Sequence, residues 1–380
     1  MSHPTRLNAS DSTDRLVRLF RYIEADPANP ALRGDAAEEC LTLGRADEAL
    51  AHAEAGLRAT PGNASLLNAK ARALMTAGRH AEAASVLADL VRLHPEPHLA
   101  FNLAFAQFYS ADASAAHKTL APFVSAEPEP AVAALWITCL HHLGEIEPAV
   151  SFAHKHEARF GSDASFLAAA ALAYFDAEAF GDADRASCTA LALDPASVEG
   201  LIVRGSLALG RADAGRALAD FEEAARRRPK DGRVLSGVGM AKLLAGDAVG
   251  ARETLQHAVA FMPSHVGTWH ALGWACIALQ SLDEAGAAMR HALDLDRNFG
   301  ESHGALAVVA ALSGKRQEAQ AAIDRAQRLD PRGLSARYAQ MVLSGEAADP
   351  AKFERTARRI LSSRSLPGGF TIADLLPRRH

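Results

Sequence analysis

Small apolar residues recur at fixed intervals along the chain and predict pairs of closely packed helices. Small side chains at regular helical positions allow two helices to approach closely, and a bulky replacement there would overpack the contact. Short turns such as LGRADEAL and LSGKRQEAQ separate the two helical segments of each unit, and a glycine there can end the first helix. One alanine stands about twelve residues before the end of each unit, at Ala49, Ala83, Ala116, Ala149, Ala183, Ala217, Ala251, Ala285 and Ala319. A second position, usually small, lies twelve residues earlier, at Ala37, Ala71, Ala104, Ile137, Ala171, Gly205, Gly239, Gly273 and Ala307.

Prolines mark the ends of these units at an almost constant spacing. The steps from Pro27 to Pro95 are 34 residues long, and two steps of 33 residues follow to Gly161. From there the step is again 34 residues, to Pro195, Pro229, Pro263, Arg297 and Pro331. A fixed period of this length is the signature of a repeat architecture. The spacing predicts nine full units after a leading half unit.

The repeated unit resembles the tetratricopeptide repeat. The resemblance rests on the 34-residue period, on small residues at positions 8, 20 and 27 of the unit, and on proline at position 32. The best copy runs from Trp269 to Asp296, and its matching residues are Trp269, Leu272, Gly273, Ala285 and Ala292. The resemblance implies an all-α fold, a right-handed superhelical solenoid of antiparallel helix pairs, in which the first helix of each pair lines the concave face.

The ends of such an array need caps, because a terminal unit would otherwise leave its apolar face in water. We expect an N-terminal tail and capping helix over residues 1–29, nine repeats over 30–332, a C-terminal capping hairpin over 333–365 and a tail over 366–380. The hairpin is predicted from two segments, 334–344 and 350–363. The leading helix is predicted from Leu16, Val17, Leu19, Phe20 and Ile23.

Repeat three carries the most aromatic candidate binding surface. By resemblance to the family, positions 2, 5, 9, 12 and 13 of a first helix face the groove, and in repeat three they are His98, Phe101, Phe105, Phe108 and Tyr109. The packed side would then hold Ala100, Leu103, Ala104 and Gln107. The alternative is a core stripe in a shifted helix, because the three phenylalanines follow i, i+4, i+7 spacing. The other groove candidates are Asn68, Arg72, Asn102, His142, Phe175, Met240, His270 and Trp274.

The candidate ligand follows from the chemistry of these positions. Asn68, Arg72 and Asn102 resemble part of the clamp with which chaperone-binding members hold a C-terminal carboxylate, but the next repeat lacks the second basic residue. An apolar, aromatic groove suits an extended or amphipathic peptide whose side chains fill pockets. Repeat three is also irregular, since Pro122 falls inside its second helix and should kink it.

Composition narrows the class of protein further. The 380 residues carry 40 Lys and Arg against 45 Asp and Glu, and this mild acidic excess argues against a general nucleic-acid or anionic-membrane binder. The sequence shows neither a signal peptide nor a run of about 18 apolar residues, so we expect a cytoplasmic protein without membrane insertion. The scattered cysteines Cys40, Cys139, Cys188 and Cys276 are expected to be buried small hydrophobes.

No catalytic or metal-binding motif stands out in the sequence. GxxxxGK[ST], GxSxG and HExxH are absent, and the neighbouring histidines His141 and His142 lack the i, i+4 spacing of a metal fork. We therefore expect no cofactor and no enzymatic activity. The favoured hypothesis is a scaffold or adaptor that binds a protein or peptide partner within a bacterial multiprotein assembly. A regulatory or substrate-presenting subunit of a separate enzyme, such as a glycosyltransferase, is the alternative, and self-assembly into a homo-oligomer is a third.

Overall fold

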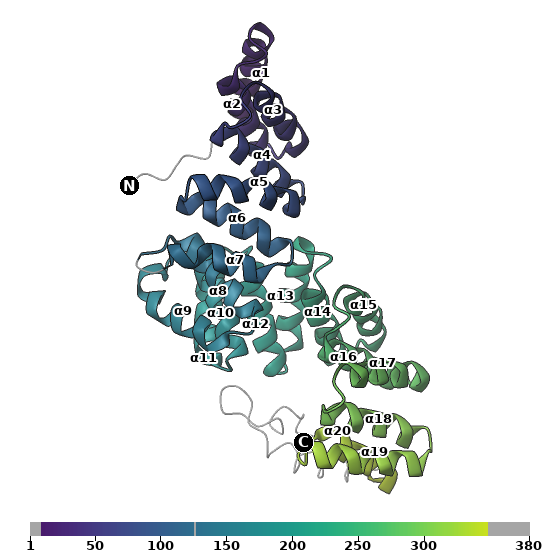
Figure 1. Ribbon diagram of the computed structural model, residues 1–380. Coiled ribbons are helices and arrows are strands. Elements are labelled where there is room, and N and C mark those ends of the chain that lie inside the picture. Colours follow the sequence, from purple (N-terminus) through teal and green to yellow (C-terminus); the bar gives the residue numbers. More distant parts are fainter. Residues whose placement is uncertain (1–8, 125–126, 349–380) are drawn as a thin grey trace. The chain divides into compact units, whose positions relative to one another are not determined.

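The computed structural model describes residues 9–124 and 127–348, and these residues form α-helices, two 3-10 turns and connecting loops without a strand. The structure divides into two compact units, Met1–Ala173 and Tyr174–His380. Within each unit, successive helices pair as antiparallel hairpins that stack in sequence order (Figure 1). The predicted all-α fold of helix pairs is therefore confirmed.

The helices agree closely with the predicted hairpins. The first unit holds α1 Ala9–Ala25, α2 Pro30–Thr42, α3 Ala46–Ala59, α4 Ala64–Thr76, α5 His80–Leu93, α6 Pro97–Tyr109, α7 Ala113–Leu120, η1 Ala121–Phe123, α8 Pro130–His142 and α9 Ile146–Phe160. Helix α10, Ala164–Asp176, contains the boundary. The second unit continues with α11 Phe180–Leu193, α12 Val198–Gly210, α13 Ala214–Arg227, α14 Gly232–Leu244, α15 Ala248–Phe261, α16 Val266–Ala278, α17 Leu282–Leu295, α18 Gly300–Leu312, α19 Arg316–Leu329, α20 Leu334–Ser344 and η2 Glu346–Ala348.

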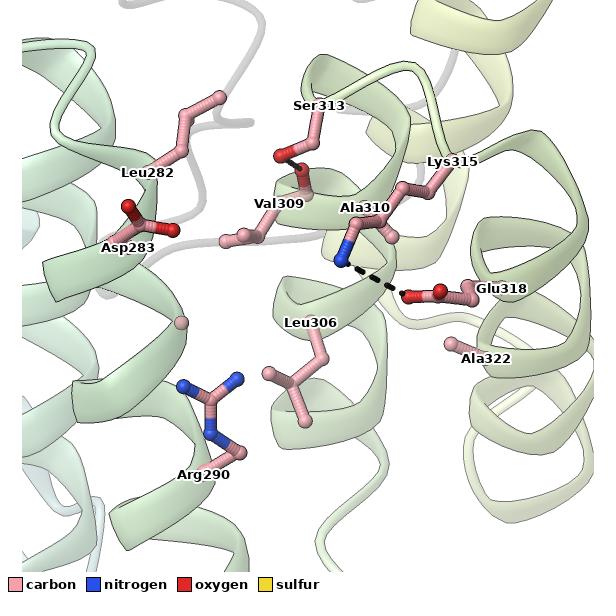
Figure 2. A pocket seen from close by; sticks show the side chains of 11 residues that line it. Leu282, Asp283, Arg290, Leu306, Val309, Ala310, Ser313, Lys315, Glu318 and Ala322 are labelled. Carbon is pink, nitrogen blue, oxygen red and sulfur yellow. Dashed lines mark hydrogen bonds and ion pairs between the residues drawn. The ribbon is translucent and has the colours of Figure 1, made fainter.

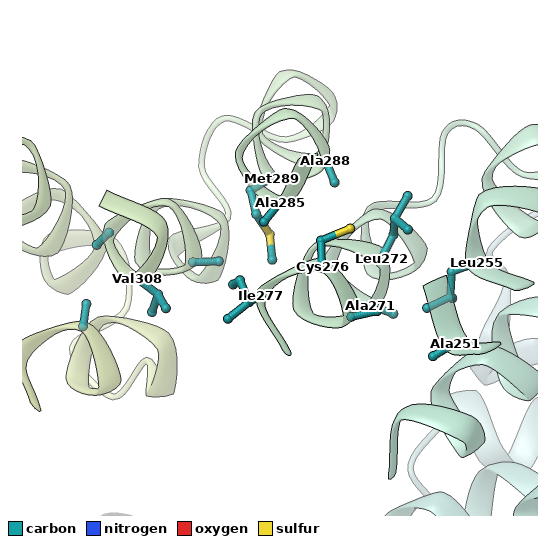
Figure 3. Packing of buried hydrophobic residues seen from close by; sticks show 14 of the residues in the cluster. Ala251, Leu255, Ala271, Leu272, Cys276, Ile277, Ala285, Ala288, Met289 and Val308 are labelled. Atoms are coloured by element: carbon teal, nitrogen blue, oxygen red, sulfur yellow. The ribbon is translucent and has the colours of Figure 1, made fainter. Parts of the chain in front are cut away.

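The small residues lie where the helices of a hairpin meet. All nine alanines of the first set are fully buried, and every member of the second set is buried as well. In the second unit, Ala251, Ala285 and Met289 belong to one continuous core cluster (Figure 3). A Cβ added at Gly237 would lie 2.2 Å from the ring of Phe221, so only glycine fits this contact. The predicted register of the small residues is confirmed.

Local signals explain where the helices begin. The side chains of Asn63, Ser197 and Asp231 accept hydrogen bonds from backbone N–H groups in the first turns of α4, α12 and α14. Prolines open α2, α6 and α8, where the missing N–H would have no partner in the helix. The repeat therefore encodes helix starts as well as the packed positions.

Repeat three departs from the regular hairpin. Its second helix, α7, has 8 residues, whereas the second helices of the flanking repeats, α5 and α9, have 14 and 15. Pro122 lies in the 3-10 turn that follows α7. The prediction of a kink is therefore corrected, because the proline ends the α-helix instead of bending it.

The N-terminal cap is confirmed and the C-terminal cap is described in part. Leu16 and Ile23 of α1 are buried in a cluster with Ala36 and Cys40, but Val17 is exposed, contrary to expectation. Helix α20 matches the first segment of the predicted C-terminal hairpin, and residues 350–363 and the tail 366–380 lie outside the described residues.

Two further sequence expectations can be compared with the described residues. Cys40, Cys139 and Cys276 are buried as expected, whereas Cys188 is exposed, so its prediction was wrong. Burial raises the pKa of the Cys139 thiol to about 12, which keeps it protonated. None of the helices in the described part of the chain has the length and apolar character needed to cross a membrane.

Candidate functional site

An aromatic cluster covers one side of α6 in the first unit. Successive rings lie in contact, with centroid distances of 6.1 Å between Phe101 and Phe105 and 4.5 Å between Phe105 and Tyr109. Phe108 lies 5.5 Å from Tyr109 in an edge-to-face arrangement. These are the distances at which aromatic pairs attract each other beyond simple burial. We call these four residues the α6 aromatic cluster.

The cluster is neither free side chains nor core. Phe101, Phe105 and Phe108 are half-buried against a cluster that includes Leu120 and Leu135, and Tyr109 keeps 50% of its surface exposed. The apolar surface of these rings is therefore only partly removed from water in the isolated chain.

The opposite side of α6 settles the register of the helix. Ala100, Leu103 and Ala104 are buried, and the hydroxyl of Thr119 on α7 donates a 2.8 Å hydrogen bond to Gln107 Oε1. The helix is therefore not shifted, because the predicted packed residues do pack. The phenylalanines add a second, partly covered apolar side to the same helix.

Two histidines extend the aromatic cluster beyond α6. The ring of His142, at the end of α8, lies 4.7 Å from Phe108, and the ring of His80, at the start of α5, lies 5.3 Å from Tyr109. Burial lowers the pKa of His80, and its Nδ1 has no hydrogen-bond partner among the described residues. Sequence reasoning missed His80 because it belongs to a second helix, and its place at the N-terminus of α5 was the available signal.

Polar candidates beside the cluster are linked to neighbouring repeats. Asn102 Nδ2 donates a 3.0 Å hydrogen bond to Asn68 Oδ1 on α4. Arg72 forms an ion pair with Glu38 on α2, with 2.5 Å between Nη1 and Oε2. His98 is exposed and lies 3.3 Å from Glu96. Because Arg72 is already paired with a carboxylate, the arrangement does not form the carboxylate clamp that the sequence suggested in part.

The remaining candidates belong to the second unit and form smaller contacts. Phe175 packs edge-on against Phe180 at 5.7 Å, and Trp274 lies 6.2 Å from Tyr338 on α20. His270 Nε2 is 2.8 Å from Ser302 Oγ, and burial lowers its pKa. Met240 is exposed at the surface of α14. The structure therefore brings together the repeat-three residues and leaves these four as separate contacts.

Charged and metal-binding groups add little to this surface. Among the described residues, no group of three or more His, Cys, Asp or Glu side chains is arranged to hold a metal ion. The basic run at the end of α13 is paired with carboxylates: Arg226 and Arg227 contact Glu223, and Arg228 lies 2.7 Å from Glu199. The helices α6 and α8 contain no Asp, Glu, Lys or Arg, so the aromatic cluster lies in an uncharged stretch.

Comparisons with known proteins identify the repeat. Two tetratricopeptide repeat family models match the chain, one over residues 40–103 and the other over residues 266–299. A search of curated protein sequences finds no match.

Solved structures with similar folds were also found. One is YrrB, described as a TPR protein with an unusual peptide-binding site, with 20% identity, a TM-score of 0.39, and coverage of 50% of this chain and 97% of that one. Another is the APC/C hetero-tetramer Cut9–Hcn1, with 15% identity, a TM-score of 0.43, and coverage of 88% and 87%. A third is MamA, with 18% identity, a TM-score of 0.38, and coverage of 45% and 94%.

Proposed function

The chain is a tetratricopeptide repeat protein, and we propose that it is a non-catalytic scaffold or adaptor that binds an apolar or amphipathic peptide segment on the α6 aromatic cluster. The observation that carries the proposal is the incomplete burial of Phe101, Phe105, Phe108 and Tyr109 on one helix face. Large aromatic rings are the side chains that most often anchor a partner, because docking removes their remaining apolar surface from water.

The surroundings favour an apolar ligand over a charged one. No acidic or basic residue lies on α6 or α8, and the nearest guanidinium candidate, Arg72, is held by Glu38. The Asn68–Asn102 pair places amide groups on neighbouring first helices, where they can exchange hydrogen bonds with the backbone of an extended peptide. We further propose that the partner is part of a larger bacterial assembly, as the array of repeats suits the joining of several components.

Selection of ligands from a displayed library of random peptides tests the proposal. The full chain is immobilised, and selected peptides are then measured against Tyr109→Ala by fluorescence anisotropy. We expect Tyr109→Ala to weaken binding by about 2 kcal/mol or more, roughly thirtyfold, if Tyr109 is an anchor.

Tyr22→Ala is the matched control. Tyr22 is an exposed tyrosine of the same unit, on α1, away from the α6 aromatic cluster. Its replacement should leave peptide affinity unchanged. If no peptide is enriched, or if enriched peptides bind the Tyr109→Ala protein as tightly as the original chain, the proposed function is wrong.

A further inference from the structure

A cavity of about 290 Å³ lies between α17, α18 and α19 in the second unit (Figure 2). Its floor is apolar and half-buried, formed by Leu306 and Val309 of α18 and Ala322 of α19. The size is at the lower end of the range for small-molecule sites, and an apolar floor with a few polar groups is the usual composition of such sites.

The cavity is open because a glycine stands where the preceding repeat has an arginine. Thirty-four residues before Gly286, Arg252 extends from α15 to form an ion pair with Glu284 of α17, with 3.8 Å between Nη1 and Oε2. Gly286 has no side chain to place in the equivalent space. Glu318, which corresponds to Glu284, instead pairs with Lys315 at 3.6 Å. The repeat therefore leaves one position empty that it fills elsewhere with the chain's own side chain.

Two charges of opposite sign on α17 border this space. Asp283 and Arg290 are exposed, and neither forms a hydrogen bond or ion pair with another residue in the described part of the chain. Seven residues of helix separate their Cα atoms by about 10 Å along the helix axis. The guanidinium of Arg290 reaches over Gly286, since its Nη1 lies 3.2 Å from the position that a Cβ would take there. Lys315 and Glu318 neutralise each other on the opposite rim.

We propose that this cavity binds a short zwitterionic peptide of about three residues. Its ammonium group lies toward Asp283, a central apolar side chain packs on Leu306 and Val309, and its carboxylate pairs with Arg290. A guanidinium matches a carboxylate with two parallel N–H···O hydrogen bonds, which favours this ion over a neutral end. Three extended residues span about 10 Å, which matches the spacing of the two charges. This site is independent of the α6 aromatic cluster, so either can fail without the other.

Calorimetric titration of the full chain with the tripeptide Ala-Leu-Ala tests this inference. The peptide with free termini should bind, and the same peptide with an acetylated N-terminus and an amidated C-terminus should not, because both charges are gone. Arg290→Gln and Asp283→Asn should each weaken binding by about tenfold or more. Gly286→Arg should abolish it, because this substitution restores the arginine that fills the equivalent position of the preceding repeat.

Arg328→Gln is the control, since Arg328 is an exposed arginine of α19 that does not line the cavity. It should bind the tripeptide with unchanged affinity. The substituted positions other than Gly286 are exposed, and unchanged thermal unfolding will show that each variant is folded. Absence of binding to the original chain, equal binding of the blocked peptide, or full affinity in Gly286→Arg would each overturn the inference.

Discussion

At the scale of single residues, the turns between paired helices show how tightly the repeat fixes its backbone. Gly44, Gly78 and Gly144 end first helices in the left-handed region, with φ of 72°, 74° and 77°. The equivalent turns at other repeats keep this conformation without glycine, at Ala111, Glu178, Ala212 and Gln280. The sequence predicts the turns and the role of glycine, but not that the conformation persists when a Cβ is present. The hydrogen bonds of the turn impose it, as when Ser281 N–H donates to Cys276 C=O at 2.9 Å.

Replacing one of these residues by glycine should therefore stabilise the protein. Gln280 has a φ of 59°, a conformation that strains a residue with a Cβ. Gln280→Gly relieves this strain, although glycine loses more backbone entropy on folding, and we expect a net gain of about 0.5–1 kcal/mol in the free energy of unfolding. Urea denaturation measures the change. The reverse substitution at the matching turn, Gly314→Gln, should lower stability, and a loss of stability in Gln280→Gly would contradict the explanation.

At the scale of the element, α6 shows what a helical pattern can and cannot predict. The buried positions of Leu103 and its neighbouring alanines follow from the repeat register, because packing against the next helix fixes one side of α6. The half-burial of Phe105 does not follow, since it depends on the shortened α7 and on rings supplied by His80 and His142. Sequence reasoning offered either a fully exposed groove or a core stripe. The structure has an intermediate arrangement, because neighbouring rings cover each other.

Alanine substitutions along α6 should accordingly give a graded loss of stability. Leu103→Ala removes a buried side chain and should cost about 2–5 kcal/mol. Tyr109→Ala removes a half-exposed ring and should cost about 1 kcal/mol or less, while Phe105→Ala should fall between the two. Chemical denaturation of the three variants measures this order. If Tyr109→Ala costs as much as Leu103→Ala, the ring belongs to the core and the α6 aromatic cluster is not a recognition surface.

At the scale of the whole molecule, histidines recur at packed positions of both units. Burial is the first cause that lowers the pKa of His52, His80, His156, His265 and His270. Arg33 lowers the pKa of His52 further, and Lys155 and Arg159 act in the same direction on His156. His156 is buried, and its Nε2 has no hydrogen-bond partner among the described residues. The helices thus hold these imidazoles in the neutral form. Sequence alone predicts the packed positions but not this effect, because the shift depends on how much water each ring loses.

The sign of the resulting pH dependence follows from proton binding. A histidine whose pKa is lowered by folding binds protons more readily in the unfolded chain, so its stabilising effect is present above the ordinary pKa of 6.5 and is lost as pH falls below that value toward the folded pKa. We therefore expect the free energy of unfolding to be roughly constant between about pH 8 and pH 7, and to fall as the pH decreases from about 6.5 to 5. Urea denaturation across this range measures the slope.

Replacing one buried histidine separates this effect from the titration of carboxylates. His270→Gln keeps a side chain able to hydrogen-bond Ser302 but removes the titrating group, so its stability should fall less steeply below pH 6.5 than that of the original chain. His257→Gln is the matched control, because His257 is an exposed histidine of the same unit, and its slope should equal that of the original chain. Carboxylates such as Glu223, whose pKa is lowered from 4.5 by hydrogen bonds from Arg226 and Arg227, lose their contribution only at lower pH. An identical slope for the His270→Gln and His257→Gln proteins would show that burial of His270 does not contribute to acid sensitivity.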